Sequence, residues 1–398
     1  MKLVTTVQMQ AIEKEADSKG LTYDQMMENA GRGLAEIILD LYPDEGTVKV
    51  FGLVGPGNNG GDTLVALAVL AEAGWSAHAY LVKRKKDALV KRLLEAGGEV
   101  SSAADDENFE DLEAGLGEAD IVLDGILGTG VKLPLKEEIG NVLAESIVIL
   151  SDLDESPLVV AVDCPSGVDC DTGETADETI PADITVTMAA VKQGLLIFPA
   201  FEHVGELKVV DIGLPQDLNA FQDLHTEVAE EQLVASILPE RPIDAHKGTF
   251  GTALIAAGSF NYTGAPLLAG LAAYRVGVGL VTLAVPAPLH SAIAGQFPEA
   301  TLILLPHEQG VVSGNAAEVL VKNIERATAL LVGPGFGTED ETKDFIENLL
   351  EGKSVLKKGK SHIGFVQNES EKKEEKSSSL PPLVFDADGL KLLAKIKD

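Results

Sequence analysis

The chain of 398 residues is long enough for two domains. Hydrophobic residues make up 45% of it and aromatic residues only 5%, which favours the aliphatic layers of an α/β protein. With 31 basic and 63 acidic residues the formal net charge is −32, which argues against nucleic acid and anionic membranes as partners.

The first predicted element, residues 1–20, has the pattern of an amphipathic helix with interspersed charge and not that of a signal peptide. No apolar run in the sequence is long enough to span a bilayer. A cytoplasmic location is therefore expected.

From Lys49 onward, short β-branched runs alternate with helical patterns, which predicts a parallel sheet with right-handed crossovers. The strands expected in this first sheet are residues 48–54, 77–82, 121–123, 158–162, 184–188 and 207–210. Together they define a first domain over residues 1–215, of three-layer, Rossmann-like α/β fold.

Residues 216–240 are acidic and weakly patterned, which suits a linker or a packing helix, and we assign them as a linker. A second α/β series follows over residues 241–398. It has expected strands at 251–257, 279–285, 329–332 and 383–385 and an Ala/Leu-rich helix at 264–275. Residues 352–382 are rich in Lys, Glu and Ser, and we expect them to form a flexible insertion.

The most informative motif is the run Gly-Pro-Gly-Asn-Asn-Gly-Gly-Asp at residues 55–62, between an expected strand and an expected helix. Its glycines at 55, 57 and 60 fit the turn that brings backbone N–H groups at a helix N-terminus close to a pyrophosphate. Asn58, Asn59 and Asp62 are not needed by a dinucleotide fingerprint, so they predict a site that also handles a sugar, an ion or chemistry. The basic stretch at 83–86 suits either a 2′-phosphate or a solvated turn.

Polar residues follow three further strands. Asp124 precedes a Gly-rich turn at 125–130, and Asp163 begins the stretch Asp-Cys-Pro-Ser that ends at Ser166. Lys192 follows the strand expected at 184–188. Because open α/β sheets bind ligands at the carboxyl ends of their strands, these groups are expected to face one crevice. The oxygen donors of Asn59, Asp124 and Ser166 would suit a hard cation.

Asp163 could serve as an acid or base in this crevice, whereas Ser166 lacks the G-x-S-x-G context of a nucleophile. The two cysteines, Cys164 and Cys170, are too few for a disulfide framework and make a poor metal site. In the second domain His246 lies beside a Gly-rich turn and is a candidate ligand contact.

Taken together, these motifs resemble the NAD(P)H-hydrate epimerase domain over residues 1–215. The resemblance also rests on Met-Met-Glu-Asn-Ala-Gly at 26–31, Lys-Gln-Gly-Leu at 192–195 and Val-Asp-Ile-Gly-Leu at 210–214. From His246 the chain is similar to the ADP-dependent NAD(P)H-hydrate dehydratase of ribokinase-like fold. That similarity rests on the stretches at 246–259, 262–265, 273–279, 333–335 and 385–388. The whole chain thus resembles the bifunctional repair enzymes of nicotinamide nucleotides.

This resemblance implies a substrate, NADHX or NADPHX, whose R and S forms differ at the hydroxyl on nicotinamide carbon 6. Asp163 and Lys192 are implied as the acid/base pair, and Asn59, Asp124 and Ser166 as ligands of a potassium ion. A complete dehydratase would also use ADP or ATP with magnesium, and a homo-oligomer is expected. The implied substrate-binding residues are Asn58, Asn59, Gly60, Gly61, Asp62, Gly128, Thr129, Gly130, Val131, Lys132, Leu133, Pro134, Asp163, Ala265 and Gly335.

The second domain departs from the family pattern, because the Gly-Thr-Gly-Asp anion hole and the preceding nucleotide loops do not occur in the sequence. We therefore expect a truncated dehydratase module without activity. Two other functions stay open on the sequence alone. A non-catalytic dimerising module would not need Asp163, Lys192 and the cation ligands together, and a small-molecule kinase of ribokinase type would need the missing Gly-Thr-Gly-Asp motif.

Overall fold

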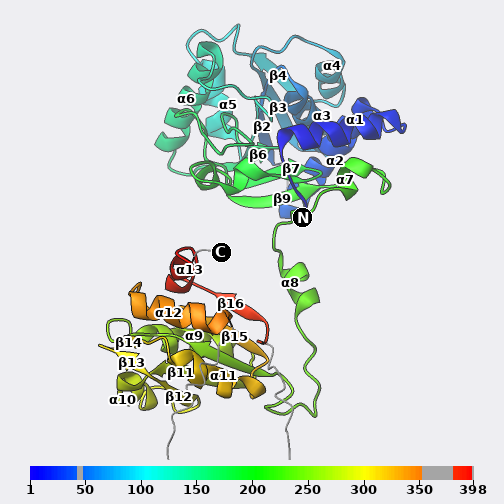
Figure 1. Ribbon diagram of the computed structural model, residues 1–398. Coiled ribbons are helices and arrows are strands. Elements are labelled where there is room, and N and C mark those ends of the chain that lie inside the picture. Colours follow the sequence, from blue (N-terminus) through cyan, green and yellow to red (C-terminus); the bar gives the residue numbers. More distant parts are fainter. Residues whose placement is uncertain (43–47, 352–379, 397–398) are drawn as a thin grey trace, which may run out of the picture. The chain divides into compact units, whose positions relative to one another are not determined.

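The computed structural model describes residues 1–42, 48–351 and 380–396, and the chain divides into two compact units, Met1–Leu238 and Pro239–Asp398 (Figure 1). None of the helices in these described ranges is long and apolar enough to cross a membrane.

A seven-stranded sheet forms the centre of the first unit, and each neighbouring pair of its strands is parallel. In spatial order the strands are β4 (Glu99–Ser102), β3 (Ser76–Leu81), β2 (Lys49–Val54), β5 (Ile121–Gly125), β6 (Leu158–Val162), β7 (Ile184–Met188) and β9 (Glu206–Val210). A separate parallel pair joins β1 (Leu3–Val4) to β8 (Val191–Lys192). The expected strands are all present, whereas β4, a short edge strand of mixed polarity, was not predicted.

Helices cover both faces of this sheet, because successive side chains of a strand point to opposite faces. In β2, Val50 and Val54 belong to one core, and Phe51 and Leu53 belong to the other. The first core contains residues of α1 (Thr6–Ser18), α2 (Tyr23–Leu41), α3 (Asn58–Glu72) and α4 (Ala88–Glu95). The second contains residues of α5 (Glu110–Glu118) and α6 (Glu137–Asp152). The predicted three-layer α/β fold is confirmed.

The helices that flank the Gly-rich turn follow from local sequence signals. Both α1 and α2 begin at capping boxes, in which Thr5 pairs with Gln8 and Thr22 pairs with Gln25. α3 is apolar around most of its circumference and is buried between α2 and the sheet. It starts at Asn58, earlier than the predicted start at residue 63, so the Gly-rich run is itself the first turn of the helix.

The linker expected over residues 216–240 is wrong for its first half. Leu218 is buried in a core of the first unit. The carboxylate of Glu15 on α1 accepts hydrogen bonds from the backbone N–H groups of Asn219 (3.0 Å) and Ala220 (2.9 Å) and so caps α7 (Asn219–Gln222). α8 (Glu231–Ile237) has no buried residue, and the boundary between the units follows it at Leu238.

The second unit is built on a five-stranded parallel sheet. Its strands, in spatial order, are β12 (Thr301–Leu305), β11 (Leu280–Pro286), β10 (Thr252–Ala256), β15 (Ala329–Val332) and β16 (Leu383–Phe385). β13 (His307–Glu308) and β14 (Val311–Val312) form a short antiparallel pair. The helices are α9 (Gly264–Arg275), α10 (His290–Ala294), α11 (Ala316–Lys322), α12 (Asp340–Leu350) and α13 (Asp388–Leu393). The edge strand β12 was not predicted.

Most of the insertion expected over residues 352–382 lies outside the described residues, which resume at Leu380. There, the Leu330 N–H donates a hydrogen bond to the Pro382 carbonyl at 2.9 Å as the chain enters β16.

Candidate active site

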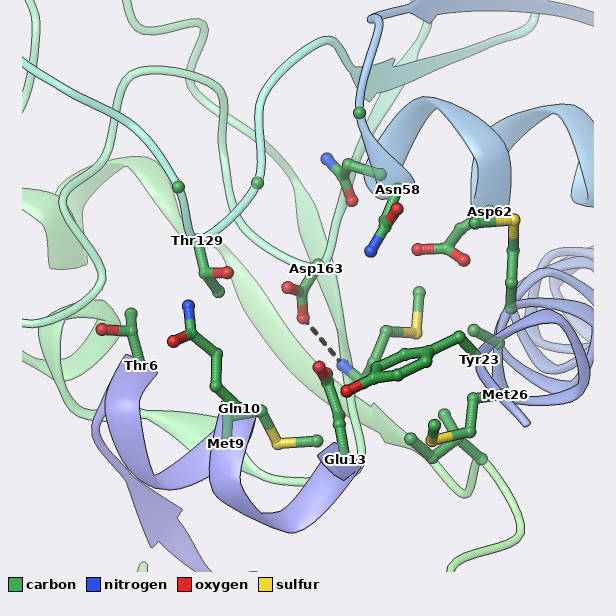
Figure 2. A pocket seen from close by; sticks show the side chains of 18 of the residues that line it. Thr6, Met9, Gln10, Glu13, Tyr23, Met26, Asn58, Asp62, Thr129 and Asp163 are labelled. Atoms are coloured by element: carbon green, nitrogen blue, oxygen red, sulfur yellow. Dashed lines mark hydrogen bonds between the residues drawn. The ribbon is translucent and has the colours of Figure 1, made fainter. Parts of the chain in front are cut away.

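A cavity of ≈ 590 Å³ lies at the carboxyl ends of β2, β5 and β6 in the first unit (Figure 2). Loops after these strands form one wall, α1 and α2 form another, and β8 contributes a single side chain. The cavity therefore brings together groups from four of the predicted motifs and from the N-terminal helix. The predicted site residues that line it are Asn58, Asn59, Asp62, Gly128, Thr129, Gly130, Asp163 and Lys192.

The Gly-rich turn presents the N-terminus of α3 to this cavity. Gly57 is the N-cap residue and supplies no side-chain cap, so the first N–H groups of α3 have no side-chain acceptor. A Cβ atom at Gly60 would overlap the carbonyl oxygen of Gly55, and one at Gly55 would overlap that of Ile126. These close approaches explain why glycine occupies both positions. A helix N-terminus held open in this way suits an anionic group such as a pyrophosphate.

Arg84 stabilises the Gly-rich turn by binding its backbone carbonyl groups. The sequence predicted either a 2′-phosphate site or a solvated turn for the basic stretch at 83–86, and not this role. The Arg84 guanidinium donates hydrogen bonds to the carbonyl oxygens of Gly55 (3.0 Å) and Gly57 (3.1 Å), and its side chain is only 8% exposed. It also forms an ion pair with Asp87 at 2.8 Å. The neighbouring Lys83 forms an ion pair with Glu138.

Asn59, Asp124 and Ser166 come together as the sequence predicted. The Asp124 carboxylate accepts hydrogen bonds from the Ser166 backbone N–H (2.7 Å) and hydroxyl (2.5 Å). The Asn59 amide nitrogen donates to the Leu127 carbonyl at 2.8 Å, and Ser166 Oγ accepts from the Leu127 N–H at 2.9 Å. These bonds tie the loops after β2, β5 and β6 into one cluster of oxygen atoms.

One oxygen of this cluster lacks a partner. Asn59 is 6% exposed, and its Oδ1 atom is buried without a hydrogen bond in the described part of the chain. Asp124 is almost fully buried, and burial raises the pKa of its carboxyl although the bonds from Ser166 oppose that rise. A buried carboxylate beside an orphaned amide oxygen fits a cation that prefers oxygen ligands. Within the described ranges no group of three or more His, Cys, Asp and Glu side chains could hold a metal, so a zinc-type centre finds no support there.

Asp163 and Lys192 form an ion pair at the floor of the cavity (Figure 2). Lys192 is 1% exposed and donates to three acceptors, namely Asp163 Oδ1, Thr187 Oγ1 (3.0 Å) and the Met188 carbonyl (2.9 Å). Asp163 Oδ1 in turn accepts from the Thr187 hydroxyl (3.1 Å) and the Met188 N–H (3.0 Å). Asp163 Oδ2 accepts no hydrogen bond within the described residues. One carboxylate oxygen is therefore fixed, and the other is free to meet a ligand.

Two further carboxyl groups share the cavity with this pair. Asp62 on α3 is 8% exposed, and burial, followed by the negative charge of Asp163, raises the pKa of its carboxyl well above the usual value. Burial and the charge of Asp163 also raise the pKa of Glu13 on α1, while Lys192 opposes that shift. With three carboxyl groups around one ammonium, the site favours states in which some of these groups keep their protons.

The α1 face of the cavity was missed at the level of the sequence. Thr6, Met9, Gln10 and Glu13 line the cavity from this helix, and Tyr23 lines it from α2 (Figure 2). Their spacing of three or four residues puts the α1 set on one helix face. The sequence alone did not distinguish this face from a solvated one, because polar side chains on an amphipathic helix have the same pattern in either case. Lys192 depends on the same N-terminal segment, since Val4 of β1 pairs with it in register.

The remaining predicted site residues lie elsewhere. Gly60 and Gly61 are buried inside the first turn of α3. Residues 131–134 follow Gly130 on the same loop but are not among those that line the cavity. Ala265 and Gly335 belong to the second unit, where Gly335 packs directly against Ala265 at the start of α9. His246 Nδ1 accepts a hydrogen bond from the Gly248 N–H at 3.1 Å, which stabilises its own turn.

Comparison with known families gives two matches. Residues 23–194 match the family described as YjeF-related protein N-terminus, and residues 253–356 match the family described as NAD(P)H-hydrate dehydratase. The first match includes all the motifs that follow strands and line the cavity. The second match covers much of the second unit.

Relatives that carry both regions are bifunctional NAD(P)H-hydrate repair enzymes. That of Dictyoglomus turgidum is 31% identical over 88% of this chain and 68% of its own length. That of Pyrobaculum aerophilum is 32% identical over 89% of this chain and 69% of its own. That of Hyperthermus butylicus is 34% identical over 99% of this chain and 66% of its own.

Part of the chain is also similar to a solved structure, the ADP/ATP-dependent NAD(P)H-hydrate dehydratase of Bacillus subtilis co-crystallised with ATP and Mg²⁺. The identity is 33%, over 31% of this chain and 41% of that one, with a TM-score of 0.26.

Proposed function

The chain belongs to the family of bifunctional NAD(P)H-hydrate repair enzymes, and from this premise we propose that the cavity of its first unit epimerises the R and S forms of NADHX and NADPHX. The observation that carries the proposal is the buried Asp163–Lys192 pair at the floor of a cavity that also presents a helix N-terminus. Neither a kinase nor a purely structural dimerising module requires this combination, and family membership does not favour either alternative.

The reaction needs proton transfer at the hydroxyl of nicotinamide carbon 6. Interconversion of the R and S forms requires this tetrahedral carbon to become planar and then to be closed from its other face. Asp163 Oδ2 accepts no hydrogen bond in the described part of the chain, so it takes the hydroxyl proton and later returns it.

Lys192 acts on this step through Asp163. If it is an ammonium, all three of its hydrogens are already directed at Asp163, Thr187 and Met188. It therefore orients the carboxylate and balances its charge from a buried position. The remainder of the nucleotide binds along the turn at 55–62, where its phosphates meet the N-terminus of α3, and against Gly128, Thr129 and Gly130.

A potassium ion would be held by the orphaned Oδ1 of Asn59 together with oxygen atoms of Asp124 and Ser166. When bound, it supplies positive charge beside the loops that carry the substrate. Self-association of the chain and its cytoplasmic location stay predictions.

The epimerase assignment is tested by following the conversion of the R form of NADPHX into the S form by proton NMR, with the rate without enzyme subtracted. We expect Asp163→Asn to lower kcat by about 10²–10⁴-fold, because it removes the group that accepts the proton. Lys192→Met should lower kcat by a similar factor while substrate binding is retained. Full activity in either variant would contradict the assignment.

Potassium binding is tested by the thermal midpoint of the first unit in KCl against choline chloride at equal ionic strength. A ligand that binds only the folded state raises this midpoint as its concentration increases. We expect KCl to raise it in the wild-type chain and to have no effect in Asn59→Ala, which removes the orphaned oxygen. An equal rise in both proteins would disprove the site.

For the second unit we propose that residues 239–398 by themselves do not dehydrate the substrate, although they match the dehydratase family. The reason is the absence of Gly-Thr-Gly-Asp from these 398 residues, since without this anion hole the negative charge of the reaction has no stabilising N–H groups. A complete module would use ADP or ATP with magnesium.

A further inference from the structure

The cavity contains a second acid whose position suits the other half of the reaction. We propose that Glu13 of α1 is the proton donor and acceptor for the ring nitrogen of the substrate, as the partner of Asp163 at the hydroxyl. This inference rests on the proposed epimerase function and extends it to a residue outside the motifs after β2, β5, β6 and β7.

The chemistry requires two groups. The hydroxyl on carbon 6 and the ring nitrogen share one carbon atom, so the ring can open there. Asp163 Oδ2 takes the hydroxyl proton, the oxygen lone pair forms the C=O bond, and the electron pair of the C6–N1 bond moves to N1. N1 then needs a proton. After rotation about the C5–C6 bond N1 attacks the other face of the carbonyl carbon, returns its proton, and the oxygen regains a proton from Asp163.

Lys192 is poorly suited to supply the proton for N1. Its three hydrogens are held by Asp163, Thr187 and Met188 at the floor of the cavity. To protonate the substrate it would first have to break one of these bonds in a buried position, which has a cost in free energy.

Glu13 meets the requirements that Lys192 does not. Its half-buried side chain projects from α1 across the cavity toward the Asp163–Lys192 pair, as Figure 2 shows. In the described part of the chain its carboxyl group forms no hydrogen bond and no ion pair, so it has no structural bond to give up.

The surroundings of Glu13 raise the pKa of its carboxyl above that of an exposed glutamate. The ionisable groups that face the cavity around it are Asp163 and Lys192 at the floor, Asp62 on α3, and Tyr23 and Asp24 on α2. Burial and the charge of Asp163 raise the pKa of Glu13 against the opposing charge of Lys192. An ion-paired carboxylate beside a carboxyl of raised pKa is an arrangement that divides base from acid.

The test compares Glu13→Gln and Glu13→Asp with Glu36→Gln, which makes the same change at an exposed position of α2. All are made in the full chain and measured with NADPHX by proton NMR. In Glu13→Gln we expect kcat to fall by about 10²–10⁴-fold with KM changed by less than about threefold, and the alkaline limb of the pH profile to disappear. Glu13→Asp should recover part of the activity and the alkaline limb, and Glu36→Gln should behave as wild type.

The outcomes separate the two proposals. If the wild-type chain does not epimerise NADPHX, the proposed function fails and this inference fails with it. If the wild type is active and Glu13→Gln keeps kcat within about threefold, or loses activity only through KM, this inference alone is overturned. This inference is also overturned, and the proposed function is not, if Asp62→Asn removes the alkaline limb of the pH profile and Glu13→Gln does not. Should Glu13→Gln not fold, as judged by Trp75 fluorescence, Glu13→Asp decides by its kcat and pH profile.

Discussion

At the scale of single residues, the site depends on Asp163 in a backbone conformation that few residues adopt. Its φ is 65°, in the left-handed region, which costs a non-glycine residue about 1–3 kcal/mol. Three hydrogen bonds to Oδ1 hold the side chain against this cost. The consequence is a carboxylate that points its second oxygen into the cavity without any motion of the chain.

Asp62 gives a test of the electrostatics at this scale. The pKa of the Asp62 carboxyl is raised in the folded state. Below the unfolded value of about 3.9 the group is protonated in both states. As the pH rises above that value and through the folded one, the folded state loses stability relative to the unfolded state. Asp62→Asn, which mimics the neutral acid, should therefore be more stable than wild type at pH 7 by about 1–3 kcal/mol, and equal to it near pH 3.5.

This comparison is made by urea unfolding followed through Trp75, the one tryptophan of the chain, which packs edge-on against Tyr42. Asp154→Asn, a change at an exposed acid, is the matched control. A stability gain at pH 7 that persists unchanged at pH 3.5 would show that the charge of Asp62 is not its cause.

The sequence predicted part of the residue-level site and not the rest. Asn59, Asp124 and Ser166 were recognisable because oxygen-bearing residues ended three strands that had to meet at one edge of the sheet. The different positions of Asp163 and Lys192 in the hydrogen-bond network could not be recognised, because they depend on which carboxylate oxygen of Asp163 accepts each hydrogen bond. Glu13 was not recognised either, since one acid in an amphipathic helix has the same pattern whether it faces water or a cavity.

At the scale of elements, the ends of β2 and β5 and the start of α3 meet in a junction that leaves no room for a side chain at Gly55 or Gly60. There a Cβ at Gly60 would overlap backbone, whereas one at Gly57, three residues earlier, would meet no atom within 4 Å. Two glycines of one motif thus serve different purposes.

Alanine substitutions at these two glycines should affect the stability of the first unit differently. Gly60→Ala should force α3 away from the turn and destabilise the first unit by about 1–3 kcal/mol or more, as overpacking of a close contact does. Gly57→Ala should leave the thermal midpoint near that of wild type. Both are measured by Trp75 fluorescence on heating, and equal midpoints for the two variants would contradict the structural assignment.

Hydrophobic periodicity predicted the long elements because their buried faces are marked by apolar runs, as in β2 and β5. It did not predict β1 and β8, which have only two residues each and exist because their backbones pair. Nor did it predict that α7 closes onto α1, which depends on the position of one carboxylate, that of Glu15.

At the scale of the whole molecule, the two units have separate cores. Among the described residues no buried apolar cluster contains side chains from both sides of Leu238. The first unit buries enough apolar side chains around its own sheet to be independent of the second.

A polypeptide of residues 1–238 should therefore unfold at the same temperature as the first unit of the full chain and retain its kcat for NADPHX. The full chain with ADP or ATP and magnesium should yield no more NADPH from NADPHX than the shorter polypeptide does. Nucleotide-dependent formation of NADPH by the full chain would refute the proposal for the second unit. Loss of activity in the shorter one would show that the units depend on each other.

The pairing of β1 with β8 also sets an order of events during synthesis. Residues of β1 leave the ribosome first, and β8, which carries Lys192, follows after most of the first unit, at a rate of roughly 5–20 residues per second. Until then β1 lacks its partner strand. The cavity is thus completed late, after the central strands have been made, and a nascent chain that stops short of β8 has the Gly-rich turn but not Lys192.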